Sequence, residues 1–347
     1  MKLGIMGLLQ SGRRTIFNAL TGAGGQNSLP PSSQSDALIN TIRVPDERVD
    51  FLRDLYHPKK TTYAQVEYIL PHLTHASTQE LNASVWNKLR TCDALLHVVR
   101  NFRYPGGSAP SPEKDFGEIE DDMLLSDLAV SEKRIERIAM EKKKGRAIED
   151  EELELLMTCR ELLEKGEALR RQKKLAERPE LKGFTFLSAK PQLVIINNDD
   201  DDEALPVWGN PPDNVELLAV RGRLEMDIVD MAPDELEEFK EAYNIQESVL
   251  DRVIETSYKM LNRVSFFTVG PDEVKAWSIK AGTPARRAAG TIHSDIEKGF
   301  IRAEVLSFDH LSVHGSFQNA KKLGLVRLEG KDYEVKDGDI INFRFNV

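Results

Sequence analysis

The sequence predicts an α/β protein with a mostly parallel sheet, an inserted antiparallel helical hairpin and a C-terminal, mostly β module. Three observations support this class. Short apolar runs alternate with helical text in the first and middle parts of the chain. Residues 113–178 are densely charged and almost free of Gly and Pro. From residue 266 onward, glycines punctuate short strand-like runs. At ~150 residues per domain, 347 residues correspond to two or three domains.

The sheet is predicted from apolar runs at residues 2–6, 66–70, 94–99, 191–196 and 215–220, with a first helix over 15–20. Strands separated by helices pair in parallel. Because strand-like runs continue after the charged stretch, that stretch is predicted to be inserted into the sheet domain. The sheet domain would then comprise residues 1–112 and 180–263, with a helical segment over 233–262.

The insert, residues 113–179, has the apolar spacing of two helices that pack along one seam. The first seam contains Leu124, Leu128, Ile135 and Ile138, and the second contains Leu155, Cys159, Leu162 and Leu169. A glycine within the cationic run 142–146 separates them, which predicts an antiparallel coiled-coil hairpin. Two interpretations stay open: a solvated helical pair, or an arm that binds a protein partner.

Composition excludes several classes of protein. With 47 Lys plus Arg against 57 Asp plus Glu, the net charge is -10, so binding to nucleic acid would have to be local. Two distant cysteines form neither a disulfide framework nor a zinc motif, which predicts a reducing, cytoplasmic location. No apolar run approaches the ~20 residues of a membrane span, so no membrane partner is expected.

Residues 7–15, GLLQSGRRT, follow the first strand and precede the first helix. Both glycines of a GxxxxGK[ST] phosphate loop are in place, and such a loop turns backbone N–H groups toward an anion at a helix N-terminus. A purely structural strand-turn-helix loop is the alternative. The candidate binding residues are Gly7, Gln10, Ser11, Gly12, Arg13, Arg14 and Thr15.

Two positions of this loop depart from the motif. Arg13 replaces the Lys, and the forked guanidinium is not equivalent to a compact ammonium. Arg14 replaces the hydroxyl residue and so removes a ligand for Mg²⁺. Thr15 does not take over this role directly, because one helical step turns it by roughly 100°.

Several segments resemble the Obg-like ATPase family, the YchF group of P-loop GTPases. The N-terminal half contributes IFNALT at 16–21, VPD at 44–46, DALLHVVR at 93–100 and LSDL at 125–128. The C-terminal module contributes FFTVG at 266–270, EVKAW at 273–277, AAGTIHSD at 288–295, EKGFIRAEV at 297–305, EGKDY at 329–333 and FRFNV at 343–347. The resemblance runs through the full length.

This resemblance implies a P-loop GTPase-like domain, the coiled-coil insert, and a β-grasp-like TGS domain over residues 264–347. It also implies binding of GTP or ATP and a ribosome or RNA-containing partner. Candidate phosphate-contacting and stacking residues of the TGS domain are Arg286, Arg287, Lys298, Phe300, Arg302, Lys321, Lys322, Lys331, Phe343, Arg344 and Phe345. A solvated β surface with core phenylalanines is the alternative.

The departures from the family concentrate around the nucleotide. Gln34 stands where the first switch carries a Thr, with Ser33 and Ser35 as possible substitutes. At 70–73, Leu-Pro-His-Leu replaces the Asp that opens the second switch, and residues 74–81 contain no Gly. Asn197 and Asp200 retain an Asn and an acid of the base-recognition loop, although a polar loop after a buried strand would look the same.

Four groups that act on the nucleotide or on Mg²⁺ are absent together: the loop Lys, the loop hydroxyl, the switch Thr and the switch Asp. Their combined loss predicts poor Mg²⁺ coordination and weakened binding of GTP or ATP. The first hypothesis is a pseudo-GTPase that regulates translation through its TGS domain. The alternatives are a slow ATPase or GTPase with a non-standard loop, and a scaffold that uses the hairpin. No catalytic residue, metal ligand or oligomeric state is assigned.

Overall fold

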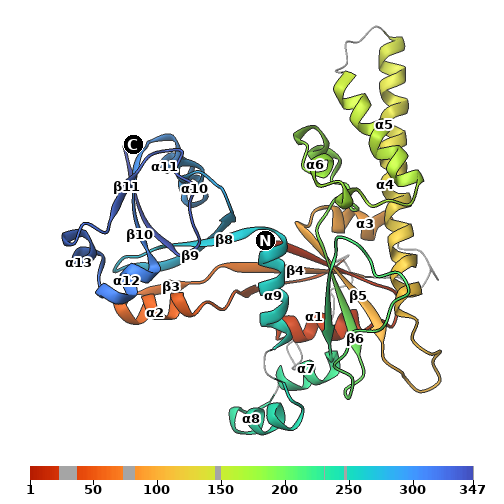
Figure 1. Cartoon of the computed structure of the whole chain (residues 1–347), viewed down its shortest axis with the longest axis horizontal. Coiled ribbons are helices and arrows are strands. Elements are labelled where there is room, and N and C mark those ends of the chain that lie inside the picture. Colours follow the sequence, from red (N-terminus) through yellow and green to blue (C-terminus); the bar gives the residue numbers. More distant parts are fainter. Residues whose placement is uncertain (23–36, 73–82, 145–149, 230, 246–247, 347) are drawn as a thin grey trace. The chain divides into compact units, whose positions relative to one another are not determined.

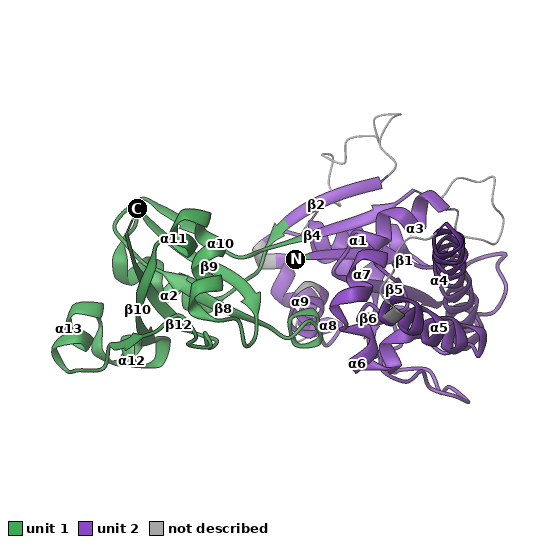
Figure 2. Cartoon of the chain, turned by 90° about the horizontal axis from the view of Figure 1, so that it is seen from above, with its two compact units in different colours: residues 1, 42–66, 257–347 green, residues 2–41, 67–256 purple. Residues whose placement is uncertain are grey.

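The computed structural model describes residues 1–22, 37–72, 83–144, 150–229, 231–245 and 248–346. The chain forms two compact units (Figure 2). The larger comprises residues 2–41 and 67–256, and the smaller comprises residue 1, residues 42–66 and residues 257–347. Within the described residues, no helix is both long and apolar enough to cross a membrane.

The larger unit is built on a six-stranded sheet with the strand order β2-β4-β1-β5-β6-β7. The strands are β1 (Lys2–Met6), β2 (Ala37–Arg43), β4 (Gln65–Pro71), β5 (Ala94–Asn101), β6 (Gln192–Asn198) and β7 (Glu216–Val220). β1 pairs in parallel with β4 and β5, and β6 pairs in parallel with β5 and β7. The predicted parallel sheet is therefore confirmed. Its central strands β5 and β6 are buried along almost their whole length, as parallel strands covered on both faces are.

Helices of this unit include α1 (Arg13–Thr21), α3 (Ala83–Arg90), α7 (Gly222–Val229), α8 (Pro233–Ala242) and α9 (Val249–Met260). α1 buries Ile16, Phe17 and Leu20. The helical character predicted over 233–262 is confirmed, and it is divided between the separate helices α8 and α9. Asn244, at φ +52°, adopts the left-handed conformation that ends a helix.

The insert forms the predicted antiparallel hairpin, with α4 (Pro112–Lys143) beside α5 (Asp150–Glu164) in Figure 1. The second seam is partly wrong, since Leu156 and Leu163 are buried more deeply than their predicted neighbours at 155 and 162. α5 is also shorter than expected. The chain turns at Gly166, at φ +76°, so Leu169 packs from the short turn Leu169–Arg171. Helix α6 (Lys173–Ala176) and the turn Pro179–Phe184 lead back to the sheet.

A buried carboxylate anchors the hairpin to the sheet domain. Asp127 is fully buried in α4 and pairs with Arg90 of α3 at 2.7 Å. Its two oxygens also accept the backbone N–H groups of Leu187 at 3.1 Å and Ser188 at 2.7 Å. One side chain therefore connects α3, α4 and the segment that enters β6.

The smaller unit contains a mixed sheet with the strand order β11-β10-β12-β8-β9-β3. The strands are β3 (Lys60–Thr62), β8 (Arg263–Thr268), β9 (Glu273–Lys280), β10 (Phe300–Ser307), β11 (Arg327–Glu329) and β12 (Asp339–Phe345). Its helices are α2 (Glu47–Tyr56), α10 (Ala285–Ile292), α11 (Ser294–Lys298), α12 (Phe308–His314) and α13 (Phe317–Lys322).

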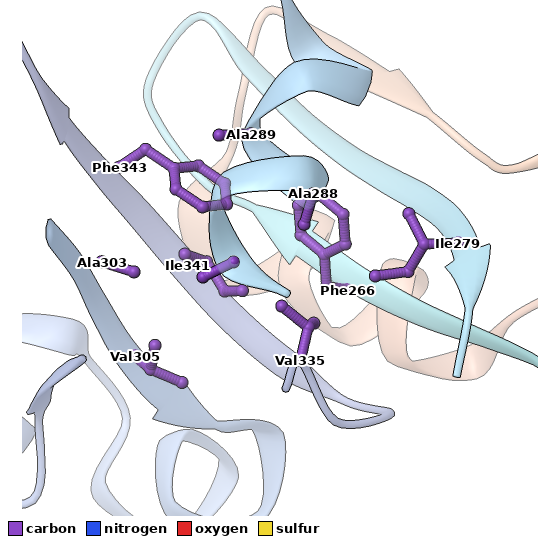
Figure 3. Packing of buried hydrophobic residues seen from close by; sticks show 10 residues of the cluster. Phe266, Ile279, Ala288, Ala289, Ala303, Val305, Val335, Ile341 and Phe343 are labelled. Atoms are coloured by element: carbon purple, nitrogen blue, oxygen red, sulfur yellow. The ribbon is translucent and has the colours of Figure 1, made fainter. Parts of the chain in front are cut away.

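The core of this unit lies between the sheet and α10 (Figure 3). Phe266 and Phe343 meet edge to face there, with ring centroids 6.0 Å apart. Ala288 and Ala289 are fully buried, and their small side chains let the helix approach the sheet closely. The mostly β composition predicted from residue 266 onward agrees with this unit.

Residues 42–66 belong to the smaller unit, although the sequence analysis assigned them to the first domain. β3 pairs in parallel with β9 at the register Lys60↔Glu273, and Arg48 of α2 pairs with Asp337 at 2.6 Å. These pairings join segments more than two hundred residues apart in the chain, a separation that local patterns do not reveal. The division into three domains stays a prediction.

The Asp127→Ala variant should lose about 3–5 kcal/mol of unfolding free energy, because it removes the carboxylate partner of Arg90 and leaves two buried N–H groups without acceptors. Urea unfolding followed by circular dichroism measures the change. Glu136→Ala, an exposed change on the same helix, should shift stability by less than about 0.5 kcal/mol. Similar losses in the two variants would contradict the anchoring role.

Candidate phosphate-binding site

The loop between β1 and α1 has the backbone of an anion cradle. Gly7 lies at φ +147°, Gln10 at +65° and Gly12 at +88°. Gln10 is one of few non-glycine residues with positive φ among the described residues. The strained turn is held by the backbone bond from Ser11 N to Leu8 O at 3.3 Å and by the first helical bond, from Ile16 N to Gly12 O at 2.9 Å.

Both positions require glycine for two reasons: φ is positive, and a Cβ atom would clash with neighbouring atoms. A Cβ at Gly7 would lie 2.3 Å from the carbonyl oxygen of Val98, and a Cβ at Gly12 would lie 2.1 Å from Nδ2 of Asn197. Neither position tolerates a side chain without movement of its neighbours. The loop thus lies against β5 on one side and the end of β6 on the other.

Asn197, the last-but-one residue of β6, connects two loops through its side-chain amide. Nδ2 donates to the backbone oxygen of Ser11 at 3.1 Å. Oδ1 accepts the backbone N–H of Gly222 at 3.1 Å. The side chain predicted to read a base therefore holds the phosphate loop and the start of α7 in register. One N–H and one lone pair of the amide are left over for a ligand.

Arg13 folds inward over the loop. A Cβ at Gly7 would lie 3.2 Å from Arg13 Cδ, so the aliphatic stem passes across the start of the loop. Its Nη1 is buried and has no hydrogen-bond partner among the described residues, and the same is true of Ser11 Oγ. Burial lowers the pKa of the Arg13 guanidinium to about 10, so the group stays charged at neutral pH. A buried, unpaired cation of this kind fits an anion.

Arg14 and Thr15 occupy the first turn of α1. Arg14 is exposed and Thr15 is half-buried. The helix N-terminus has no side-chain cap, and its first turn contains no acidic residue. Its free N–H groups and the helix dipole therefore favour a negative charge at this end.

Asp200 is not brought against the phosphate loop by any contact that the structure shows. Its carboxylate is 41% exposed and lies 4.0 Å from Nε of Arg223, which would compete with a base for it. The two retained residues of the base-recognition loop thus differ. Asn197 is buried at the loop, whereas Asp200 lies at the surface.

The sequence analysis missed the aromatic segment that follows β5. The Tyr104 hydroxyl donates to Gln10 Oε1 at 2.5 Å, and the Phe102 ring lies 3.7 Å from the position of a Cβ at Gly12. Asp199 accepts the backbone N–H of Arg103 at 3.1 Å. The sequence does contain a signal for this segment, because polar and aromatic residues directly follow a buried apolar run. Such residues gather at the carboxyl edge of a parallel sheet, where ligands bind.

Gly222 is a second residue of the site that the sequence motifs did not identify. A Cβ there would lie 2.6 Å from Asn197 Oδ1 and 2.8 Å from Ile16 Cδ1, so this small residue is needed for the loop before α7 to meet Asn197. Its neighbour Arg221 pairs with Glu203 at 3.0 Å.

The switch positions give no support for a metal site. Ser33, Gln34, Ser35 and residues 74–81 lie outside the described residues. In the part of the chain that the structure describes, no group of three or more His, Cys, Asp or Glu side chains could hold a metal ion. The backbone of the cradle fits a phosphate.

A parallel sheet with a glycine-rich loop between its first strand and helix defines a P-loop nucleotide-binding domain. The comparisons agree with this class. A family model described as "YchF-GTPase_C: Protein of unknown function (DUF933)" matches residues 264–346. The structure of the Schizosaccharomyces pombe YchF GTPase superposes with a TM-score of 0.80 at 25% identity, over 99% of this chain and 97% of that one.

Relatives match over the whole length. The "Ribosome-binding ATPase YchF" of Bacillus subtilis is 36% identical over 99% of both chains. The protein of the same description from Escherichia coli O157:H7 is 34% identical over 100% of this chain and 99% of that one. The chain belongs to the YchF family. The resemblance inferred from the sequence motifs is confirmed, and so is the α/β fold class.

Removing the amide of Asn197 should destabilise the sheet domain. In Asn197→Ala, the Ser11 oxygen and the Gly222 N–H both lose a buried partner, at a cost of about 1–3 kcal/mol each. Chemical denaturation measures the loss. Asn87→Ala, an exposed change on α3, is the matched control. A loss no larger than that of the control would show that the amide does not hold the loops.

Proposed function

We propose that this protein is a YchF-family pseudo-GTPase, which binds phosphate groups weakly without Mg²⁺ and hydrolyses nucleotide very slowly or not at all. The observation that carries the proposal is Arg13, which stands at the Lys position with a buried Nη1 that has no partner among the described residues. Such a cation neutralises a phosphate by itself and reduces the need for a metal.

The chain's own residues would act in a simple way. The loop N–H groups and the α1 N-terminus would hold phosphate oxygens, and Arg13 would balance their charge. Mg²⁺, if bound, would supply charge neutralisation between the β- and γ-phosphates. The described residues offer no carboxylate set to hold it, and Arg14 adds a positive charge in the first turn. Binding without efficient phosphoryl transfer follows.

The main alternative is a slow ATPase or GTPase. It would use Arg13 together with a repositioned Thr15, or with Ser33 or Ser35. The names of the relatives favour this alternative, since they are described as ATPases or, for the yeast structure, as a GTPase. Whether GTP or ATP binds is part of the same proposal, because the position of Asp200 constrains recognition of the base only weakly.

Ribosome association is proposed from the relatives, which are described as ribosome-binding. The smaller unit offers one cationic face for contact with the ribosome. Arg302 of β10 and Arg344 of β12 are cross-strand neighbours on one face of the sheet, whereas Phe345, the next residue of β12, alternates to the opposite face. Arg344 is held by Glu304 at 3.0 Å. A pair of arginines on one face suits contact with RNA phosphates. A cytoplasmic site of action follows from this partner.

The other candidate cations of this unit contribute less. Arg287 and Lys298 lie near acidic partners, and Arg286 donates to the backbone oxygen of Glu297 at 3.2 Å. Phe343 is in the core and Phe300 packs against it, so their stacking role is not supported. The hairpin stays a second candidate surface for a protein partner.

Nucleotide binding should be weak and indifferent to Mg²⁺. Calorimetric titration with ATPγS and GTPγS, each with and without Mg²⁺, tests this, and Arg13→Ala should lower the residual affinity at least tenfold, since it removes the loop cation whose Nη1 is buried. Lys59→Ala, an exposed change, is the control. Tight binding that requires Mg²⁺ would refute the pseudo-GTPase proposal and favour the slow enzyme.

Ribosome association should depend on the cationic face. In co-sedimentation with ribosomes, Arg302→Glu should lower the bound fraction and flatten its dependence on salt, because one phosphate contact is lost. Lys280→Glu, an exposed change at the end of β9, serves as the control. If only deletion of the hairpin tip abolishes binding, the interaction belongs to the hairpin instead.

A further inference from the structure

A groove of about 540 Å³ lies in the smaller unit, where the sheet is incomplete between β12 and β9. β8 lies between these two strands. It ends at Thr268, and the turn 269–272 then leads into β9. Among the described residues, the parallel ladder of β12 and β8 contains one pair, Ile340↔Phe267, whereas β12 continues to Phe345. The second half of β12 therefore has a neighbouring strand, β10, on one edge and none on the other.

Hydrogen bonds at the two ends of β12 show which backbone groups face the open edge. Toward β10, the carbonyl oxygen of Gly338 accepts the N–H of the first residue of α12, and the N–H of Asn346 donates to Gly299 O, both at 2.9 Å. Backbone groups point to alternate edges along a strand. The N–H and C=O groups of Phe343 and Phe345 are therefore directed to the open edge, and among the described residues these groups form no hydrogen bond.

Both faces of the groove are apolar. On the α10 side it is lined by Trp277, Ile292 and Ile296, which also pack against the core of the unit. On the other face of the sheet, where α2 and α13 lie, it is lined by Tyr56 and Phe317. Side chains of a strand alternate between the two faces. A strand placed in this groove would therefore find apolar contacts on both of its faces.

The charge of the lining narrows the class of occupant. Among the described residues, Glu273 is the one charged residue that lines the groove. Its carboxylate is already held by Thr62 Oγ1 at 2.6 Å and by Lys60 Nζ at 3.1 Å. Because no cation lines the groove, it does not suit the phosphates of a nucleic acid. Free N–H and C=O groups at alternate positions instead match the backbone of an extended polypeptide.

We propose that this groove binds an extended segment of a partner protein, which adds a strand beside β12 and places apolar side chains on both faces. The segment pairs with the N–H and C=O groups of Phe343 and Phe345. At ~3.3 Å per residue, the open edge over residues 342–345 is about 13 Å long, so three or four residues of the partner pair with it. The phosphate loop and the two arginines of the cationic face do not line the groove, so the inference is independent of the proposed function.

Calorimetric titration of the full chain tests the proposal with a peptide of the sequence Lys-Val-Ile-Val-Thr-Val-Lys, acetylated and amidated at its ends. The terminal lysines keep this probe soluble, and its centre favours an extended strand. We expect binding in the micromolar to low millimolar range. The same peptide with prolines at its third and fourth positions should bind at least tenfold more weakly, because proline removes the N–H donors of a ladder.

Hydrogen exchange measured by NMR locates the added strand. In the free chain, the amides of Phe343 and Phe345 should exchange faster than those of Asn342 and Arg344, which face β10. Binding of the peptide should slow exchange of the first two amides at least tenfold and leave the other two unchanged. A compound that merely fills the apolar space would not protect two alternate amides of one strand.

Variants assign the contacts. Phe345→Ser removes an apolar side chain from the groove, and Val269→Glu places a charge in its lining, so each should weaken peptide binding at least tenfold. Leu323→Ser, a change at an exposed apolar residue outside the lining, should leave binding unchanged. If Val269→Glu does not fold, Phe345→Ser and the exchange rates still decide.

Four results would overturn the proposal. The peptide does not bind, the proline peptide binds equally well, or the protected amides lie elsewhere than at Phe343 and Phe345. The fourth result is a dimer of this chain, seen by size-exclusion chromatography without peptide and abolished by Phe345→Ser, which would assign the groove to a second copy.

Discussion

The geometry of the candidate site depends on one buried amide. Asn197 ends the most buried strand of the parallel sheet, and its side chain holds the phosphate loop through Ser11 and the start of α7 through Gly222. The contact works only because Gly12 and Gly222 have no Cβ. Three separate loops are thus fixed at the carboxyl edge of the sheet, where ligands bind in open α/β folds. The cradle can persist as a scaffold even where catalytic residues have changed.

Within that cradle, Arg13 and Arg14 stand at the Lys and hydroxyl positions of the phosphate-loop motif, while both glycines keep a positive φ. Arg13 fills the space beside Gly7 and keeps a cation at the loop. Arg14 places a second charge on the first turn of the helix. A phosphate can still be held by N–H groups and a guanidinium, whereas transfer of a phosphoryl group needs a metal and ordered switch residues. This separation between binding and catalysis is the physical basis of the proposed function.

Two buried polar pairs of different character lie at the base of the hairpin. Asp127 is fully satisfied by Arg90 and by two backbone N–H groups, as a structural buried ion pair requires. Arg170 and Glu120 form the other pair and retain unpaired atoms. Among the described residues, only the first of these pairs is a fully satisfied network.

The sequence by itself determined the parallel sheet, the hairpin, the place of the glycine loop after the first strand, and the family, because each depends on local periodicity or on short motifs such as GLLQSGRRT. Only the tertiary structure decided the role of Asn197, the place of residues 42–66 in the smaller unit, and the groove beside β12. Each of these depends on side chains or strands that are distant in the chain and meet only through packing. Such contacts have no periodicity along the sequence, so only the folded chain brings them together.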